Sequence, residues 1–484
     1  MSIALTYDIS KRGNVPIYEF LYRCIRNDIL RGTLKAGEKL PSKRTLSKTL
    51  GVSMVTVENA FHQLVLEGYV ESRPRSGYYV QEIGDYPFVL KNTSHFSPAL
   101  SSSTSPTKLQ AIKHDEDEPD ATLKANRTGL HEFPLSIWMR LLRKAIAENP
   151  PDLYNTVPYN GLPQLRLAIA NYLLRARGMN VSPSQIIIGA GTEYLYGRIL
   201  QLLSPNAIFA FENPGYQKLA HIADNYNVSW TYCNVDRFGM NIARLRSSNA
   251  NVVHVSPANN FPTGVTMPVG RRRELLEWAH ERPNRYIIED DYDSELRYEG
   301  NITLPLFAND SHEKIIYLNT FSKTLMPSLR ISYMILPKPL LARYKETMSF
   351  YSCTVSGLEQ RALAKFIDEG YFERHIVRLR NHYKRQREAV MKAIRASALG
   401  PRSHLIENNA GTHFLLHLDT KMTATQIKRA AVNEGIEIAL LSDYCFEPNP
   451  VADKIIVVNY ASLAPEDIDD TVSRLVRALV PEST

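Results

Sequence analysis

The sequence predicts a multidomain protein, with a small and mostly helical N-terminal unit followed by a large α/β domain. The 484 residues are too many for one ordinary domain, and 44% of them are hydrophobic, enough for a large packed core. Residues 14–82 contain three short helical patterns and a β-hairpin. Residues 126–484 alternate apolar strand-like runs with amphipathic helices, the pattern of a mostly parallel sheet covered on both faces. Residues 83–125, Ser/Pro-rich and then acidic, are expected to form a linker.

Charge and cysteine usage narrow the class of protein. The net charge is +7, and residues 1–80 alone hold 12 Lys and Arg against 7 Asp and Glu, which favours a nucleic-acid partner for the N-terminal unit. The four cysteines are scattered without paired spacing, which predicts a reducing compartment, no disulfide and no metal site. Without a signal peptide or an apolar run of about 18 residues, we expect a cytoplasmic protein that does not span a membrane.

The N-terminal helices have the spacing of a helix-turn-helix. The first helix presents one apolar face, made by Ile17, Leu21, Cys24, Ile25 and Ile29. Ser42 can cap a second helix, which Gly51 ends, and Ser53 can cap a third. Two short helices joined by a Gly-containing turn are typical of DNA-binding units.

A basic hairpin follows these helices. The strands YVES and GYYV flank the turn RPRSG, and a hairpin in this position forms the wing of a winged helix. Ser53 and Thr56 would then lie at the start of a helix that enters the major groove. Phosphate contacts are expected from Ser42, Lys43, Arg44, Arg73 and Arg75. The alternative is a helical interaction module whose charges are only solvated.

The segment KLPSKRTLSKTLGVSMVTVENAFHQLVLEGYVESRPRSGYYV is similar from end to end to the GntR-type winged helix. This resemblance implies that the partner is a double-stranded DNA operator. Met54 and Glu58 depart from the family, since basic residues are common at both positions. These departures leave the base contacts open without affecting the predicted fold.

The α/β domain contains residues that suit one cofactor. Asp290 ends the buried run RYIIED, at the strand edge where open α/β sheets bind ligands. A buried carboxylate needs a cationic partner, and the protonated pyridine nitrogen of pyridoxal phosphate (PLP) is one. Tyr292 could donate to the ring oxygen, and Lys323 lies just past the next strand. The run GAGTE opens a helix, so its backbone can bind a phosphate, together with Ser322 and Arg330.

The spacing of these residues resembles fold-type I PLP enzymes, and within them the MocR/GabR-type regulators. The likeness covers nearly the whole chain, including GAGTE, ENPGY, FPTG, EDDYDSEL and TFSKTLMPSLRISYMILP. It implies that Lys323 forms the internal aldimine, that Asp290 pairs with the pyridine nitrogen and that Tyr292 contacts the ring oxygen. The remaining cofactor positions match Tyr216, which stacks on the ring, and the phosphate-binding Gly191, Thr192, Ser322 and Arg330. The likeness also implies a homodimer, in which Tyr154 or Tyr159 reaches the partner's site.

Three departures concern the ligand. Phe261 precedes PTG where aminotransferases often have the Asn that bonds the ring oxygen, although Asn259 and Asn260 stand before it. Lys218 stands where an Arg occurs in relatives. Val457 replaces the Arg with which many aminotransferases hold the substrate carboxylate.

The sequence therefore predicts a PLP-dependent, DNA-binding transcription regulator that senses an amine or amino-acid effector by external aldimine formation. One alternative is a catalytically active aminotransferase with an accessory N-terminal domain, because Lys323 and Asp290 suffice chemically for amine transfer. Another is a repressor that has lost PLP and keeps the domain for dimerisation.

Overall fold

The computed structural model describes most of the chain outside the expected linker. The described residues are 5–12, 16–30, 32–66, 69–73, 76–80, 121–123, 133–148, 151–298, 304–407 and 410–480. They divide into two compact units, with the boundary after residue 118. Residues 81–120, which include most of the expected linker, and Arg75 lie outside the described residues.

The N-terminal unit is a helix-turn-helix followed by a hairpin. Its helices are α1 (Ile17–Leu30), α2 (Lys43–Leu50) and α3 (Met54–Leu66), and its strands are β1 (Val70–Arg73) and β2 (Gly77–Val80). As predicted, the Ser42 side chain caps α2 by accepting from the Thr45 N–H at 3.1 Å, and Gly51 ends α2 in the left-handed conformation. The antiparallel strands pair Val70 with Val80.

One hydrophobic core holds this unit together. Leu21 and Ile25 of α1 pack against Phe61 and Leu64 of α3, and all four are fully buried. The structure buries Leu21, Ile25 and Ile29 of the predicted helical face, whereas Ile17 and Cys24 stay partly exposed. The hairpin joins the same core through Val70 and Val80.

The second unit is built on an eight-stranded sheet with the order β4-β11-β10-β9-β8-β5-β6-β7. The strands are β4 (Ile186–Gly189), β5 (Phe209–Asn213), β6 (Trp230–Asp236), β7 (Gly239–Met240), β8 (Val252–Val255), β9 (Tyr286–Asp290), β10 (Ile315–Thr320) and β11 (Ser332–Ile335). Only β7 and β11 run antiparallel to the others. The carboxyl ends of β4, β5, β8, β9 and β10 therefore meet at one edge.

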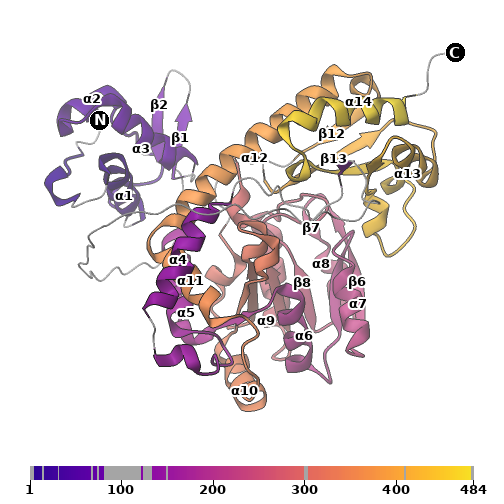
Figure 1. Ribbon diagram of the computed structural model, residues 1–484, viewed down its shortest axis with the longest axis horizontal. Coiled ribbons are helices and arrows are strands. Elements are labelled where there is room, and N and C mark those ends of the chain that lie inside the picture. The colour runs from indigo at the N-terminus through magenta and orange to yellow at the C-terminus, as the bar shows by residue number, and fades with distance from the viewer. Residues whose placement is uncertain are drawn as a thin grey trace. The chain divides into compact units, whose positions relative to one another are not determined.

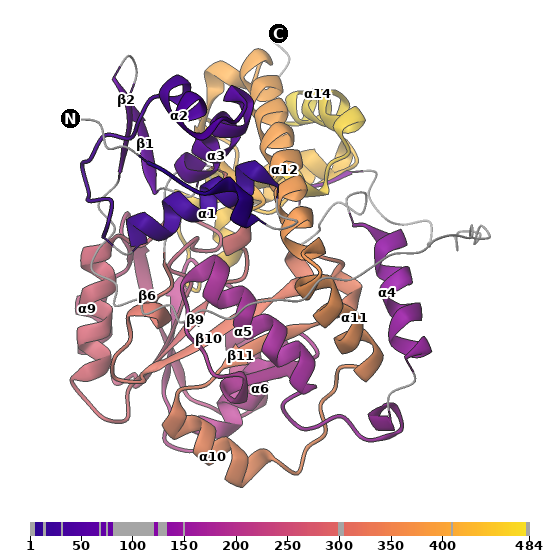
Figure 2. The ribbon, with the colours of Figure 1, turned by 90° about the vertical axis from the view of Figure 1, so that its left-hand side faces the viewer.

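Helices cover both faces of this sheet (Figures 1 and 2). One face packs against α4 (Leu135–Ala147), α5 (Pro163–Arg177), α8 (Ile242–Ser247), α9 (Val269–His280) and α11 (Gly357–Asp368). The other packs against α6 (Thr192–Leu203), α7 (Lys218–Asn225) and α10 (Lys338–Met348). Strand β10 shows the division, because Ile315 and Tyr317 face the first layer and Ile316 and Leu318 the second. This confirms the predicted α/β fold.

A smaller layer follows, formed by the antiparallel strands β12 (Ser403–Ile406), β13 (His413–Leu418) and β15 (Ile455–Asn459) with α13 (Ala424–Asn433) and α14 (Ile468–Leu479). The 26-residue helix α12 (Tyr371–Ala396) joins the layers, with Phe372 in the core of the large sheet and Val390 in that of the small one (Figure 1). Residues 121–122 form β3, which pairs with β14 (Ile436–Glu437), and Leu123 beside it is buried. Residues 121–123, which the sequence analysis assigned to the linker, belong to the second compact unit.

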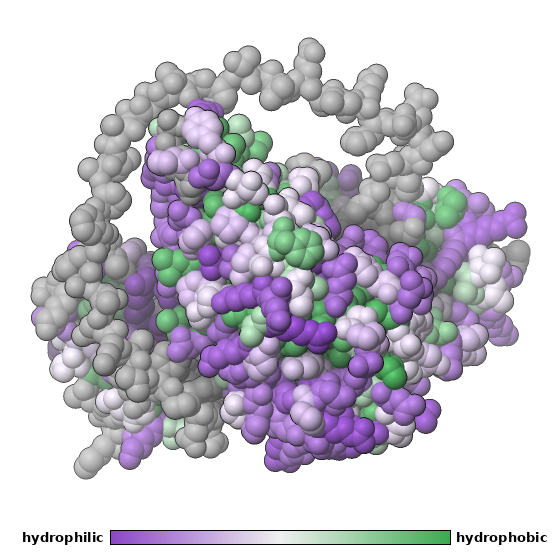
Figure 3. All heavy atoms as spheres, turned by 90° about the horizontal axis from the view of Figure 1, so that it is seen from below, coloured by the Kyte–Doolittle hydropathy of each residue, from purple (hydrophilic) through white to green (hydrophobic). Residues whose placement is uncertain are grey.

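The surface shown in Figure 3 is mostly hydrophilic, and its hydrophobic residues are distributed in small groups. Large exposed hydrophobic side chains on the described residues include Val269 and Phe350. Among the described residues, no helix combines the length and the apolar character needed to cross a bilayer.

A buried ion pair ties α5 to the end of β9. The Arg177 guanidinium lies 2.5 Å from an Asp291 carboxylate oxygen, and both side chains are almost fully buried. The Tyr317 hydroxyl donates to the same oxygen at 2.7 Å. A buried charge is tolerated only with such partners, so this pair fixes the backbone immediately after β9.

We expect Arg177→Met to destabilise the second unit by about 3–5 kcal/mol, because it leaves the Asp291 carboxylate buried without its cation. Denaturant unfolding of the full chain measures the loss. Arg175→Met is the matched control on the same helix as Arg177. Arg175 forms an exposed pair with Glu373 of α12, and exposed pairs contribute about 0–1 kcal/mol. Equal losses in the two variants would contradict the role assigned to Arg177.

Candidate functional site

The residues predicted to bind a cofactor meet at the carboxyl edge of the large sheet. They surround a cavity of about 280 Å³ whose walls include Thr192, Tyr216, Asp290, Tyr292, Ser322, Lys323 and Arg330. These residues come from segments that follow β4, β5, β9 and β10, far apart in the sequence. The fold thus brings together the side chains that the sequence analysis named one by one.

Lys323 lies just past β10, in a short 3-10 helix of residues 321–323. Burial lowers the pKa of its amine to about 8, although Asp293 and Asp290 act in the opposite direction. A lysine with a lowered pKa is more often neutral near physiological pH, and only the neutral amine can attack an aldehyde.

Asp290 ends β9 with its carboxylate at the cavity. The Oδ1 atom is buried and makes no hydrogen bond, and Oδ2 lies 3.6 Å from His254 Nε2. A buried carboxylate oxygen without a donor is costly, so the geometry favours a cationic or donor group in the cavity beside it. A protonated pyridine nitrogen meets this requirement.

The opposite end of the cavity suits a phosphate. Helix α6 begins at Thr192, directly after Gly191, and presents its N-terminus to the cavity. Ser322 Oγ is buried without a hydrogen-bond partner. Gly191 has φ +93°, and a Cβ there would lie 2.4 Å from Arg330 Nη2, so the guanidinium packs directly on the glycine. An orphaned hydroxyl, a helix N-terminus and an arginine together fit an anion.

Tyr292 belongs to a small polar network. Its hydroxyl donates to the Asn259 carbonyl at 3.2 Å, and the Asn259 amide donates to Asp293 Oδ2 at 2.6 Å. Burial raises the pKa of Asp293 to about 7, while the Asn259 amide opposes this effect. The Asn259 amide nitrogen also lies 3.4 Å from the Tyr292 hydroxyl oxygen, so Asn259 stands beside Tyr292 although Phe261 occupies the usual motif position.

Aromatic rings form one wall. Tyr216 packs edge-on against Phe261, with 6.1 Å between the ring centroids, and Phe261 contacts His413 and Tyr444 in the same manner. Burial lowers the pKa of His413 to about 4, so its imidazole is neutral at physiological pH. The position of Tyr216 in this wall is compatible with a flat ligand in the cavity.

The sequence analysis missed several polar side chains in the lining, among them His254 and Glu212. His254, on β8, is 4% exposed and contacts Tyr196 edge-on. Glu212, on β5, accepts from the Ser256 N–H at 3.1 Å, and burial raises the pKa of its carboxyl to about 8. A polar residue at an inward position of an otherwise apolar strand was the available signal, visible in VVHV and AFEN.

In the N-terminal unit, the described residues among the predicted DNA contacts lie at the start of α2, at the start of α3 and at the end of β1. Ser53 Oγ accepts from the Thr56 N–H at 3.1 Å, which caps the start of α3. Lys43 forms a 2.5 Å ion pair with Glu58, and the Arg73 guanidinium lies 4.5 Å from the Tyr79 ring centroid. Arg44 is exposed on α2, and Ser42 serves as the cap of that helix.

Comparisons with known proteins agree with this two-part architecture. Residues 17–80 match the bacterial regulatory proteins of the gntR family, and residues 118–475 match the aminotransferases of class I and II. The chain is 34% identical to YdeL, an uncharacterized HTH-type transcriptional regulator of Bacillus subtilis, over 98% of this chain and 99% of the relative. It is 31% identical to MocR of Rhizobium meliloti, a probable rhizopine catabolism regulatory protein, over 98% and 95% of the two chains.

A further relative is the pyridoxine biosynthesis transcriptional regulator PdxR of Corynebacterium glutamicum, at 31% identity over 87% of each chain. Among solved structures, an archaeal alanine:glyoxylate aminotransferase matches 74% of this chain and 90% of its own, with a TM-score of 0.66 and 23% identity. The chain belongs to the MocR/GabR-type transcription regulators, in which a GntR winged helix is joined to an aminotransferase class I and II domain.

We expect Gly191→Ala to weaken PLP binding at least tenfold, because the new Cβ displaces the Arg330 guanidinium and strains a positive-φ position. Absorbance titration of the full chain with PLP measures the affinity. Gly270→Ala is the control, since its Cβ would meet nothing within 4 Å and alanine favours a helix. Wild-type affinity in Gly191→Ala would contradict the assignment of the phosphate end.

Proposed function

We propose that this protein is a PLP-dependent transcription regulator of the cytoplasm whose binding to double-stranded DNA responds to an amine or amino-acid effector. The main support for this proposal is the cavity, which is lined by Lys323 and by Asp290 with its unpartnered oxygen. The same chain also contains a winged helix. The family supports the regulator role. The cavity supports ligand sensing rather than a domain kept only for dimerisation.

Each of these cavity residues would bind a different part of PLP. Lys323 would hold the cofactor covalently, Asp290 would pair with its pyridine nitrogen, and Tyr292 would bind the ring oxygen beside Asn259. Tyr216 would lie on the ring, and the phosphate would rest on Gly191, Thr192, Ser322 and Arg330. When bound, the cofactor supplies an imine carbon at which one amine can replace another.

The effector would be an amine that takes the place of Lys323. Val457 stands where many aminotransferases have the arginine that holds the substrate carboxylate. Its side chain is fully buried among Leu415, Leu441 and other apolar side chains. Lys218 lines the cavity, and its ammonium lies 2.7 Å from Glu193. We infer that a carboxylate on the effector, if present, is not held in the usual aminotransferase way.

Signal transmission would be a shift between arrangements of a homodimer. Such a shift requires that the effector bind one arrangement more tightly than the other. Tyr154 is 81% exposed, whereas Tyr159 packs against Tyr344 at 6.0 Å between ring centroids. Of the two tyrosines, Tyr154 is therefore the better placed to reach a partner subunit.

The second candidate function is a working aminotransferase, which Lys323 and Asp290 favour because amine transfer needs both groups. The buried Val457 argues against ordinary amino-acid substrates. Following keto-acid formation over many turnovers separates the candidates. Sustained turnover by a protein that binds no DNA would overturn the regulator proposal.

We expect one amine among those screened to change both the visible absorption of the cofactor-loaded protein and its affinity for operator DNA. Matched pairs of an amino acid and its decarboxylated amine show whether the carboxylate is needed. Lys323→Ala is the control, because it should lose both responses while it keeps the winged helix. An amine that changes the absorption and leaves DNA affinity unaltered would break the proposed coupling.

We expect Glu58→Gln to strengthen DNA binding, because Lys43 is then released from its ion pair and becomes available to a phosphate. One added phosphate contact increases the slope of log K against log salt by about 0.9. Fluorescence anisotropy with one DNA duplex at several salt concentrations measures this slope. Glu71→Gln is the matched control on the hairpin, where the partner of Glu71 is Arg73. An unchanged slope for Glu58→Gln would show that Lys43 contacts no phosphate.

A further inference from the structure

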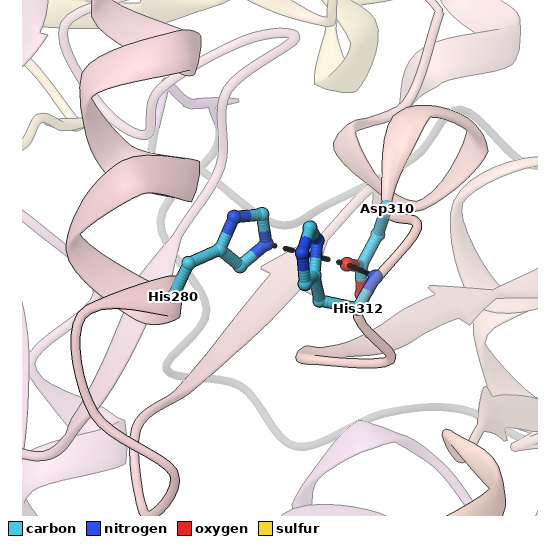
Figure 4. Close-up of side chains that lie close together, drawn as sticks. All are labelled: His280, Asp310 and His312. Atoms are coloured by element: carbon cyan, nitrogen blue, oxygen red, sulfur yellow. Dashed lines mark hydrogen bonds and ion pairs between the residues drawn. The ribbon is translucent and has the colours of Figure 1, made fainter.

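His280, Asp310 and His312 form a cluster of side chains (Figure 4), and none of them lines the cavity that holds Lys323. His280 ends α9, which precedes β9, and the other two residues lie in the loop before β10. The cluster is therefore at the amino edge of these parallel strands, opposite to Lys323. A five-residue strand separates the two edges by about 16 Å.

The three side chains converge at distances that suit a shared ion. One ligand atom from each lies within 4.8 Å of the others. His280 Nε2 is 3.7 Å from Asp310 Oδ1. Two ligands of a tetrahedral zinc ion lie about 3.4 Å apart, given metal–ligand bonds of about 2.0–2.2 Å. The His280–Asp310 separation is thus too long for a hydrogen bond and close to that of two ligands on one metal.

Hydrogen bonds with neighbouring groups orient the Asp310 carboxylate and the His312 imidazole. Asp310 Oδ2 accepts from the N–H groups of Lys314 and Ile315, and Oδ1 accepts from the His312 N–H at 2.9 Å. His312 Nδ1 lies 2.9 Å from Ser311 Oγ, and donation from Nδ1 leaves the lone pair on Nε2. Such outer hydrogen bonds orient ligands in metal sites.

The His280 imidazole also indicates a bound ligand. Its Nε2 atom is buried, makes no hydrogen bond, and faces Asp310. A buried imidazole nitrogen without a hydrogen-bond partner is satisfied when a metal ion binds it.

We propose that His280, Asp310 and His312 bind a divalent transition-metal ion, for which Zn²⁺ is the probe. Two imidazoles and one carboxylate suit zinc and its neighbours in the transition series better than calcium or magnesium. Three protein ligands leave at least one position for water. The ion would tie the end of α9 to the loop before β10. The sequence analysis predicted no metal, because it judged metal sites by cysteine spacing and these histidines lie on different elements.

Calorimetric titration of the full-length, PLP-loaded protein with Zn²⁺ tests the proposal. We expect one ion per chain, and affinity at least tenfold weaker in His312→Ala and in His280→Gln. His221→Ala is the matched control, because His221 is an exposed histidine on α7 outside the cluster. Zinc should also raise the thermal midpoint of the wild type and of His221→Ala, and not that of His312→Ala.

His312 is exposed, so its replacement is compatible with folding. An unchanged metal-free unfolding midpoint and cofactor absorption would establish this. Wild-type zinc affinity in His312→Ala, or no zinc binding by the wild type, would overturn the proposal.

Discussion

Three consecutive carboxylates at the end of β9 impose the constraint around which the second unit is arranged. Glu289 and Asp291 are buried and Asp290 is largely so, and each would be costly without a partner of its own. Glu289 accepts from the N–H groups of Leu306 and Phe307, at 2.7 and 2.9 Å. Asp291 is neutralised by Arg177. Asp290 and Asp291 each keep a buried Oδ1 without a hydrogen-bond donor, but of the two only Asp290 lines the cavity and lacks a guanidinium partner.

The partners of Glu289 and Asp291 explain how the Asp290 carboxylate is oriented toward the cavity. Because Arg177 and the backbone of the following loop hold the two flanking carboxylates, the middle one is oriented without contacts that would occupy it. His254 adds a nearby imidazole at 3.6 Å. The phosphate end is organised differently, by a helix N-terminus and a glycine that allows an arginine to approach.

The sequence predicted the features that depend on local order. The caps Ser42 and Ser53, the alternation of strands and helices, and the positions of Asp290 and Lys323 at strand ends all follow from neighbouring residues. Pairings between distant segments could not be predicted in this way. Nothing in EDDYD indicates that Asp291 meets Arg177, more than a hundred residues earlier, and nothing in the helix pattern pairs Lys43 with Glu58. His254 and Glu212 interrupt apolar strands, but a single sequence does not show what they face.

The alternation along β9 has a consequence for how the family can vary. Successive side chains of a strand point to opposite faces, so inserting or deleting one residue in β9 would exchange the surroundings of its acidic residues. The carboxylate that now pairs with Arg177 would then face the cavity, and the Asp290 carboxylate would face the apolar layer. A length change that leaves the cavity intact would therefore have to fall in the loops that precede β9 and β10, at the amino edge of the sheet.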